Sequence, residues 1–205
     1  MKIEGDYTFS AARAAVWSAL QDPRVLAATL PGVRRLEVVG PDRYALDAML
    51  GVGAVKGAFD GTFEIVDKDE PEACTLRGSA RGAPGSVQTT ARVRLHERDG
   101  VTVLEYDADA TVAGSIAGVG QRMLAAAAKR TASDFFGAVE RALSEGLPPE
   151  AAATDGAPAP AAGPGRVFTA PPRAETDARA FAAGVAAGFL LALAGVVVGR
   201  WTARR

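Results

Sequence analysis

The feature that most constrains the fold of this chain is a long amphipathic segment at residues 115–143. Its apolar side chains recur at spacings of three and four, as the buried stripe of a helix requires: Ile116, Val119, Met123, Ala127, Thr131, Phe135, Val139 and Leu143. Ser115 precedes the stripe as a candidate N-cap, and Gly146 with Pro148 follows it as a stop signal. We therefore predict one long helix against which the preceding part of the chain packs.

The residues before this helix alternate between apolar and polar, which is typical of half-buried strands. Strands are predicted at residues 2–9, 34–39, 44–50, 55–66, 74–83, 86–97 and 102–112. Between the first two, Ser10 and Asp22-Pro23 each signal the start of a short helix, and Pro31-Gly32 ends the second. Turns of hairpin length join the other strands, so we predict an α+β fold with a curved antiparallel seven-stranded sheet around the long helix.

The inward faces of these strands carry small residues near the middle of the predicted sheet. They are Gly57, Gly61, Gly78, Ala80, Ala108 and Ala110. Two interpretations follow from this pattern. Either the helix packs closely on the sheet, since protein interiors normally fill to crystal-like density, or the small residues leave a cavity open. The pattern alone leaves both interpretations standing.

The composition changes after residue 145, which ends the predicted folded domain of residues 1–145. Residues 146–178 are rich in Ala, Pro and Gly and predict a disordered linker, because they cannot bury enough apolar surface. Residues 180–199 carry no charge and have the length of a membrane-spanning helix, so 179–205 is predicted to be a single-pass anchor in the cell membrane. The arginines after it favour a cytoplasmic C-terminus, whereas the absence of an N-terminal signal places the domain itself in the cytoplasm. We follow the second indication.

The sequence offers no catalytic constellation, and we predict that the protein is not an enzyme. His96, the only histidine, falls on the outward face of its strand, which argues against a His-based triad or metal site. Cys74 is expected to be a small buried apolar residue. Glu105, Asp107 and Asp109 form a solvent-facing stripe that is able to dock a basic partner. The 23 basic and 24 acidic residues nearly balance, which gives no indication of nucleic-acid binding.

Several short motifs, in order, resemble the family of the G subunit of carbon monoxide dehydrogenase. They are Trp17-x-x-Leu20 with Asp22-Pro23, Leu30-Pro31-Gly32, Val55-Lys56-Gly57 with Gly61, Ile116-Ala117-x-x-Gly120-Gln121-Arg122, and Phe135-Phe136. The family belongs to the START/Bet v 1-like (SRPBCC) helix-grip superfamily, whose element order matches the one predicted here. The resemblance covers about residues 1–145.

The resemblance implies an apolar tunnel between sheet and helix that binds lipids or other hydrophobic molecules. It also implies a partner, a molybdenum hydroxylase of the carbon monoxide dehydrogenase type, and a cargo such as menaquinone carried between bilayer and enzyme. No covalent cofactor, metal or catalytic residue is implied. The predicted tunnel residues are Gly57, Phe59, Gly61, Phe63, Leu76, Ala80, Tyr106, Ala108, Ala110, Ile116, Gly120, Met123, Leu124 and Ala127.

Two other hypotheses compete with the carrier. In one, the protein is a ligand-free membrane adaptor that recruits or helps assemble the dehydrogenase through the acidic stripe. In the other, it is an enzyme such as a cyclase or hydrolase, which the single histidine and the lack of paired interior carboxylates disfavour. We expect the carrier, with 180–199 as its attachment to the membrane.

Overall fold

The structure is a computed structural model that describes residues 1–147 and 165–169. The strands are β1 (Lys2–Phe9), β2 (Val33–Gly40), β3 (Arg43–Val52), β4 (Val55–Asp69), β5 (Ala73–Gly82), β6 (Gly85–Arg98), β7 (Val101–Ala113) and β8 (Arg166–Thr169). The helices are α1 (Arg13–Gln21), α2 (Pro23–Thr29), the short 3-10 helix η1 (Ser115–Val119) and α3 (Gln121–Glu145). The seven strands and the two short helices that were predicted are confirmed, and their bounds shift by a few residues.

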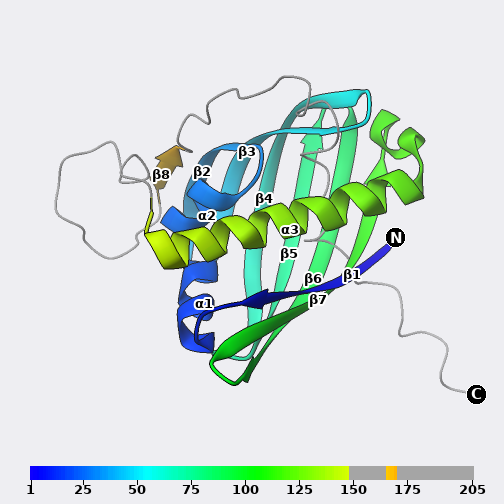
Figure 1. Ribbon diagram of the computed structural model, residues 1–205. Helices are drawn as coiled ribbons and strands as arrows, with labels where there is room; N and C mark the ends of the chain where they lie inside the picture. The colour runs from blue at the N-terminus through cyan, green and yellow to red at the C-terminus, as the bar shows by residue number, and fades with distance from the viewer. Residues whose placement is uncertain (148–164, 170–205) are drawn as a thin grey trace, which may run out of the picture.

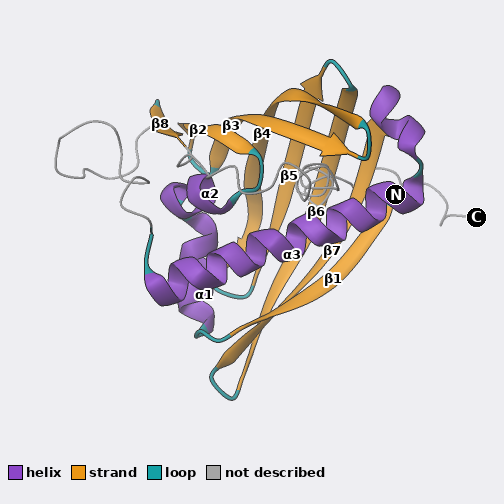
Figure 2. Cartoon of the chain, turned by 45° about the horizontal axis from the view of Figure 1, so that its top comes forward, coloured by secondary structure: helices purple, strands orange, loops and turns teal. Residues whose placement is uncertain are grey.

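The strands form one antiparallel sheet in the order β1-β7-β6-β5-β4-β3-β2-β8. Consecutive strands from β2 to β7 are neighbours because tight turns join them, whereas β1 pairs with β7, where Ile3 lies opposite Ala108. The sheet curves around α3, which crosses its concave face (Figures 1 and 2). The α+β helix-grip prediction is confirmed, with eight strands in place of seven.

The helices enter the core through their apolar faces. α3 buries Leu124, Ala128, Phe136 and Val139 against the sheet, following the period of 3.6 residues per turn. α1 and α2 lie beside the second half of α3, and they close that end of the concave face (Figure 2). The core therefore runs the whole length of α3, with α1 and α2 adding a second layer at one end only.

The long helix does not begin where the sequence predicted. Residues 115–119 form η1, Gly120 follows with φ of +91°, and α3 starts at Gln121. The hydroxyl of Ser115 donates to the carbonyl oxygen of Pro84, on the β5–β6 turn, at 3.0 Å. The prediction of an uninterrupted helix capped by Ser115 is wrong, because glycine tolerates positive φ and lets the chain change direction.

The two short helices also differ in how they begin. α2 starts at Pro23 as predicted, and the Asp22 carboxylate accepts a hydrogen bond from the Arg24 backbone N–H at 2.8 Å. α1 has Ala12 at its N-cap, so the prediction that Ser10 caps it is wrong. The backbone N–H of Ser10 instead donates to the Glu140 carboxylate of α3 at 3.0 Å, which fixes the β1–α1 loop against the long helix.

The eighth strand was not predicted from the sequence. β8 lies inside residues 146–178, where a disordered linker was expected, and pairs with β2 so that Phe168 lies opposite Leu36. Phe168 is 5% exposed and joins the core next to α2. The linker prediction is wrong at this strand, because backbone hydrogen bonds to a sheet edge and one buried aromatic ring are enough to order four residues.

None of the helices within residues 1–147 and 165–169 is both long and apolar enough to cross a bilayer. The membrane segment predicted at 180–199 lies outside the described residues, as does most of the predicted linker.

Candidate functional site

A largely enclosed apolar cavity of about 70 Å³ lies between the sheet and the second half of α3. Its walls are Trp17, Leu20, Gln21, Leu26, Phe63, Ile65, Cys74, Leu76, Ala91, Val93, Leu95, Leu104, Tyr106, Ala132, Phe135 and Phe136. None of these side chains carries a charge at neutral pH. Such a lining favours apolar groups and excludes ions, since burying an unpaired charge is very unfavourable.

One wall of the cavity is a cluster of aromatic rings around Phe136. Its ring centroid lies 5.6 Å from that of Tyr7, 6.0 Å from that of Phe9 and 5.8 Å from that of Tyr106. Contacts at these distances and tilted angles are favourable beyond the area that the rings bury. Ala132, one turn earlier on α3, presents only a methyl group to the cavity. The helix therefore leaves space beside Phe136, whose ring is held in place by the other aromatic rings.

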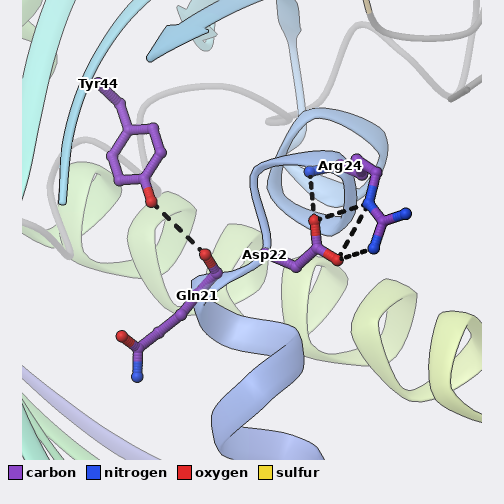
Figure 3. A network of polar contacts seen from close by, with 4 residues as sticks. All are labelled: Gln21, Asp22, Arg24 and Tyr44. Carbon is purple, nitrogen blue, oxygen red and sulfur yellow. Dashed lines mark hydrogen bonds and ion pairs between the residues drawn. The ribbon is translucent and has the colours of Figure 1, made fainter. Parts of the chain in front are cut away.

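The opposite wall is held by polar contacts at the α1–α2 junction, shown in Figure 3. The Tyr44 hydroxyl lies 3.5 Å from the carbonyl oxygen of Gln21, to which it donates, and its ring stacks on Phe63 at 4.7 Å. Asp22 caps α2 and pairs with the Arg24 guanidinium at 2.6 Å. These contacts fix the sharp turn between α1 and α2, and so position Gln21 and its neighbours over the cavity.

Burial raises the pKa of two groups near the cavity, the Tyr44 hydroxyl and the Cys74 thiol. Burial, with the nearby Asp42 and Asp22 carboxylates, raises the pKa of Tyr44 to about 12, so the hydroxyl keeps its proton and remains a donor. Burial also raises the pKa of the Cys74 thiol to about 11. Since the thiolate is the nucleophilic form, Cys74 is unreactive at neutral pH.

The site therefore has the character of a binding cavity. The lining side chains that carry polar groups are Trp17, Gln21, Cys74 and Tyr106, and among the described residues no three His, Cys, Asp or Glu side chains are grouped to hold a metal ion. His96 lies on the outer face of β6, 3.6 Å from Glu105, as its place in the alternation predicted. The lining residues can shield an apolar molecule from water, because nearly all the surface that they present to the cavity is apolar.

The structure brings only part of the predicted tunnel together. Phe63, Leu76 and Tyr106 line the cavity. A larger group is buried between the sheet and the first half of α3 and does not line it: Phe59, Ala80, Ala108, Ala110, Ile116, Leu124 and Ala127. In this half the helix packs closely on the sheet, which is the first of the two interpretations of the small residues.

The two predicted tunnel glycines on β4 are explained by close approach. A Cβ atom on Gly57 would lie 2.6 Å from Cγ of Pro84, and one on Gly61 would lie 3.0 Å from the carbonyl oxygen of Ser79. Neighbouring groups therefore already occupy the space beside both glycines. Small residues at these positions let the strands and turns approach one another.

Gly120 and Met123 do not belong to the tunnel, and their prediction is wrong. Both are exposed, Met123 to 51%. The 3-10 turn and the break at Gly120 change the phase of the helix, so the buried stripe of α3 starts at Leu124 and Met123 falls beside it.

The sequence reasoning missed Trp17, Leu26 and Ala132 as cavity residues. In the sequence, Trp17 and the pair Phe135-Phe136 stand out as motifs of the family resemblance. The missing information was where α1 and α2 dock, which depends on contacts between distant parts of the chain.

Comparison with known proteins places this geometry in a family. A family model for the G subunit of carbon monoxide dehydrogenase (CoxG) matches residues 5–144. This chain belongs to the CoxG family. The predicted resemblance is thereby confirmed over residues 5–144, which include every residue that lines the cavity.

Solved structures share the fold of this domain. A conserved protein from Geobacillus kaustophilus is 34% identical, with a TM-score of 0.68, and the match covers 71% of this chain and 96% of that one. A START superfamily protein from Mycobacterium smegmatis is 13% identical, with a TM-score of 0.56 and coverage of 70% and 97%. Ara h 8.0201 is 16% identical, with a TM-score of 0.52 and coverage of 71% and 98%. The last two show a shared fold alone. No curated protein sequence matches the chain significantly.

Proposed function

We propose that this member of the CoxG family binds a hydrophobic small molecule of the quinone class in the cavity beneath Ala132 and Phe136. The observation that carries the proposal is an enclosed lining without a charged side chain, built from seven different elements. An apolar ring placed there leaves water, and each buried CH₂ group contributes about 0.8 kcal/mol. The surface of the cavity is almost entirely apolar, so the proposed binding rests on the burial of apolar groups.

The present size of the cavity sets a requirement on binding. An engineered apolar cavity of about 150 Å³ binds benzene, and the cavity here has about 70 Å³. A fused quinone ring therefore fits only after the walls move apart. The α1–α2 layer is the wall that can move without breaking the sheet, because it is joined to β1 and β2 by loops and meets α3 through side chains.

We further propose that the protein serves a molybdenum hydroxylase of the carbon monoxide dehydrogenase type, as the family name indicates. In this role the domain lies in the cytoplasm and residues 180–199 attach it to the cell membrane. The ligand, for which menaquinone is our first candidate, passes between bilayer and enzyme inside the domain. The support is the family match together with an apolar cavity of the right chemistry.

Trp17 provides a direct test because it lies in the cavity wall. The chain has two tryptophans, so Trp201→Phe leaves Trp17 as the only one. Quinones quench tryptophan emission at close range, and titration of the full chain in detergent with menaquinone-4 is expected to give saturable quenching at one ligand per chain.

A matched pair of variants makes this test specific. Ala132→Leu places three extra carbon atoms in the cavity and should abolish saturable quenching, whereas Ala126→Leu adds the same atoms on the exposed face of α3 and should not. Unsaturable quenching, or equal quenching in both variants, would contradict quinone binding at this site.

A second candidate function is the ligand-free adaptor, and one observation favours it. On the outer face of the β1–β7 pair, Glu4 lies directly opposite Asp107 and Asp6 opposite Glu105, and like charges in cross-strand pairs are destabilising. Asp109 extends this acidic stripe, which basic residues flank: Arg92 and Arg94 on β6 lie opposite Asp107 and Glu105, and Lys2 lies opposite Asp109. If this surface recruits the dehydrogenase, replacing Glu105, Asp107 and Asp109 by their amides should abolish recruitment, whereas Ala132→Leu should not affect it.

A further inference from the structure

Three segments that are distant in the sequence meet at one end of the sheet, next to the start of α3. They are the β3–β4 turn at 51–56, the β5–β6 turn at 82–86 and the stretch 113–123 that contains η1, and we call them the small-residue tip. The Ile116 backbone N–H donates to the carbonyl oxygen of Pro84 at 3.0 Å. The Met123 sulfur lies beside Gly53, where an added Cβ would be 3.3 Å away. Both ribbon views show η1 next to these turns (Figures 1 and 2).

The surface of the small-residue tip differs from the rest of the molecule. Its exposed residues include Gly53, Ala54, Gly118 and the half-exposed Met123. The chain has 24 acidic residues, but none falls in these three segments, whose only charged side chains are Lys56 and Arg122. Neither cation forms an ion pair with any residue in the described part of the chain.

The opposite end of the sheet has the contrary character. The β4–β5 and β6–β7 turns lie together there, since the Leu95 backbone N–H donates to the carbonyl oxygen of Glu72 at 2.7 Å. Their acidic residues are Asp67, Asp69, Glu70, Glu72, Glu97 and Asp99, against two basic residues, Lys68 and Arg98. An anionic surface would repel this end and attract the other, so the domain is polarised along its strands.

We infer that the small-residue tip docks the domain on the surface of an anionic lipid bilayer. Exposed apolar and small groups with flanking cations are the chemistry of interfacial membrane binding, in which side chains such as methionine enter the headgroup region and cations meet anionic lipids. The inference goes beyond the proposed function, because the small-residue tip lies at the end of the sheet opposite the cavity lining of Cys74 and Leu95. It names a face that holds the domain on the bilayer, and this face is not the entrance to the ligand site.

The test uses the full chain with Cys74→Ala and one new cysteine that carries an environment-sensitive NBD dye. At Met123→Cys the dye emission should shift to the blue on vesicles of phosphatidylcholine and phosphatidylglycerol (3:1), and less on phosphatidylcholine alone. At Arg98→Cys, the last residue of β6 at the opposite end of the sheet, it should stay unshifted. A dye at residue 123 that remains in water, or equal shifts at both positions, overturns the inference.

Charge variants test the role of the two cations. Each basic residue near an anionic membrane contributes about 1 kcal/mol, which is about a fivefold change in equilibrium. Lys56→Gln with Arg122→Gln should therefore lower the ratio of docked to undocked tips about 25-fold. Arg92→Gln with Arg94→Gln removes the same charge from the outer face of β6 and should leave that ratio unchanged.

Three other outcomes of these experiments also distinguish membrane docking from the alternatives. A blue shift at residue 123 without vesicles, with the mass of a dimer, would assign the tip to a second copy of the chain and overturn membrane docking. A chain that binds quinone while its tip stays in water would leave the proposed function standing and remove this inference. Docking without quinone binding would do the reverse.

Discussion

The two halves of α3 cover the same sheet with opposite results. The first half packs Leu124, Ala127 and Ala128 on a part of the sheet that is itself rich in alanine, and these residues are buried without lining the cavity. The second half places Ala132 and Phe135 over larger side chains and leaves about 70 Å³ unfilled. Small residues on both surfaces let helix and sheet approach, whereas large rings that are fixed by other contacts hold them apart.

The comparison also shows that a small residue occurs on the buried face of α3 for two different structural reasons. Ala128 is small because the sheet is close, but Ala132, one turn later on the same face, is small beside a cavity. Protein interiors fill where side chains are able to interdigitate. The same substitution at the two positions should therefore have different consequences, and the following experiments use this difference.

The largest effect is expected from truncating a leucine in the closely packed half. Leu124 is 2% exposed, and Leu124→Ala should lower the free energy of unfolding by about 3–4 kcal/mol, because transfer and cavity terms add. Leu76→Ala, at the half-buried cavity wall, should lower it by only about 2 kcal/mol, since one side of Leu76 already lacks contacts. Urea unfolding measures both; equal losses would argue against the contrast between the halves.

The next largest effect concerns enlargement at the two alanines. Ala128→Leu forces three carbon atoms into a filled region and should destabilise the protein by about 1–3 kcal/mol. Ala132→Leu places them in the cavity, where new contacts offset the strain, and should change stability by less than about 1 kcal/mol. If thermal unfolding shows Ala132→Leu to be the more damaging variant, the cavity is not open in solution.

A smaller effect is expected from the ionisation of Cys74 in the cavity wall. Its ordinary pKa of 9.0 is raised to about 11 in the folded protein, so the unfolded chain loses the proton first as the pH rises. The stabilising effect of the buried thiol is complete below pH 9 and declines up to pH 11. At pH 10 the loss relative to pH 8 should be about 1.4 kcal/mol.

Urea unfolding of Cys74→Ala provides the control for this pH dependence. The variant keeps every other titrating group, including Tyr44, so the difference between the two pH profiles isolates the thiol. Identical profiles for wild type and variant would show that Cys74 is not held in an apolar environment.

The smallest effect on stability is expected at Met123, the neighbour of Leu124, whose truncation should have the largest effect. Met123 precedes Leu124 but is 51% exposed, and Met123→Ala should change stability by less than about 0.5 kcal/mol. A loss of about 2 kcal/mol or more would mean that Met123 is buried in solution, which would restore it to the predicted tunnel.

Most of the fold could be predicted from the sequence, because strand alternation, turn residues and helix starts are patterns of neighbouring residues. Alternation in β4 and β6 and the turns between them predicted a meander, and Asp22-Pro23 predicted the start of α2. β8 escaped prediction because its order comes from the edge of β2 and from the burial of Phe168, and neither is visible in a short Ala- and Pro-rich segment.

The candidate site was harder to predict than the fold. The alanines and glycines of the sheet were assigned to a tunnel, but size alone does not distinguish a filled contact from an open one. Pro84 fills the space beside Gly57, and the docking of α1 brings Trp17 to the cavity. Both facts depend on how distant segments pack, so they required the structure.

The most direct test of the central claim is the mass spectrometry of molecules extracted from the purified full chain after contact with cellular lipids. The account predicts an apolar molecule, of quinone class, in a ratio approaching one per chain in wild type and in Ala126→Leu. It predicts loss of that molecule in Ala132→Leu, while the variant remains folded. No bound molecule in the wild type, or equal amounts in all three proteins, would contradict a ligand site beneath the second half of α3.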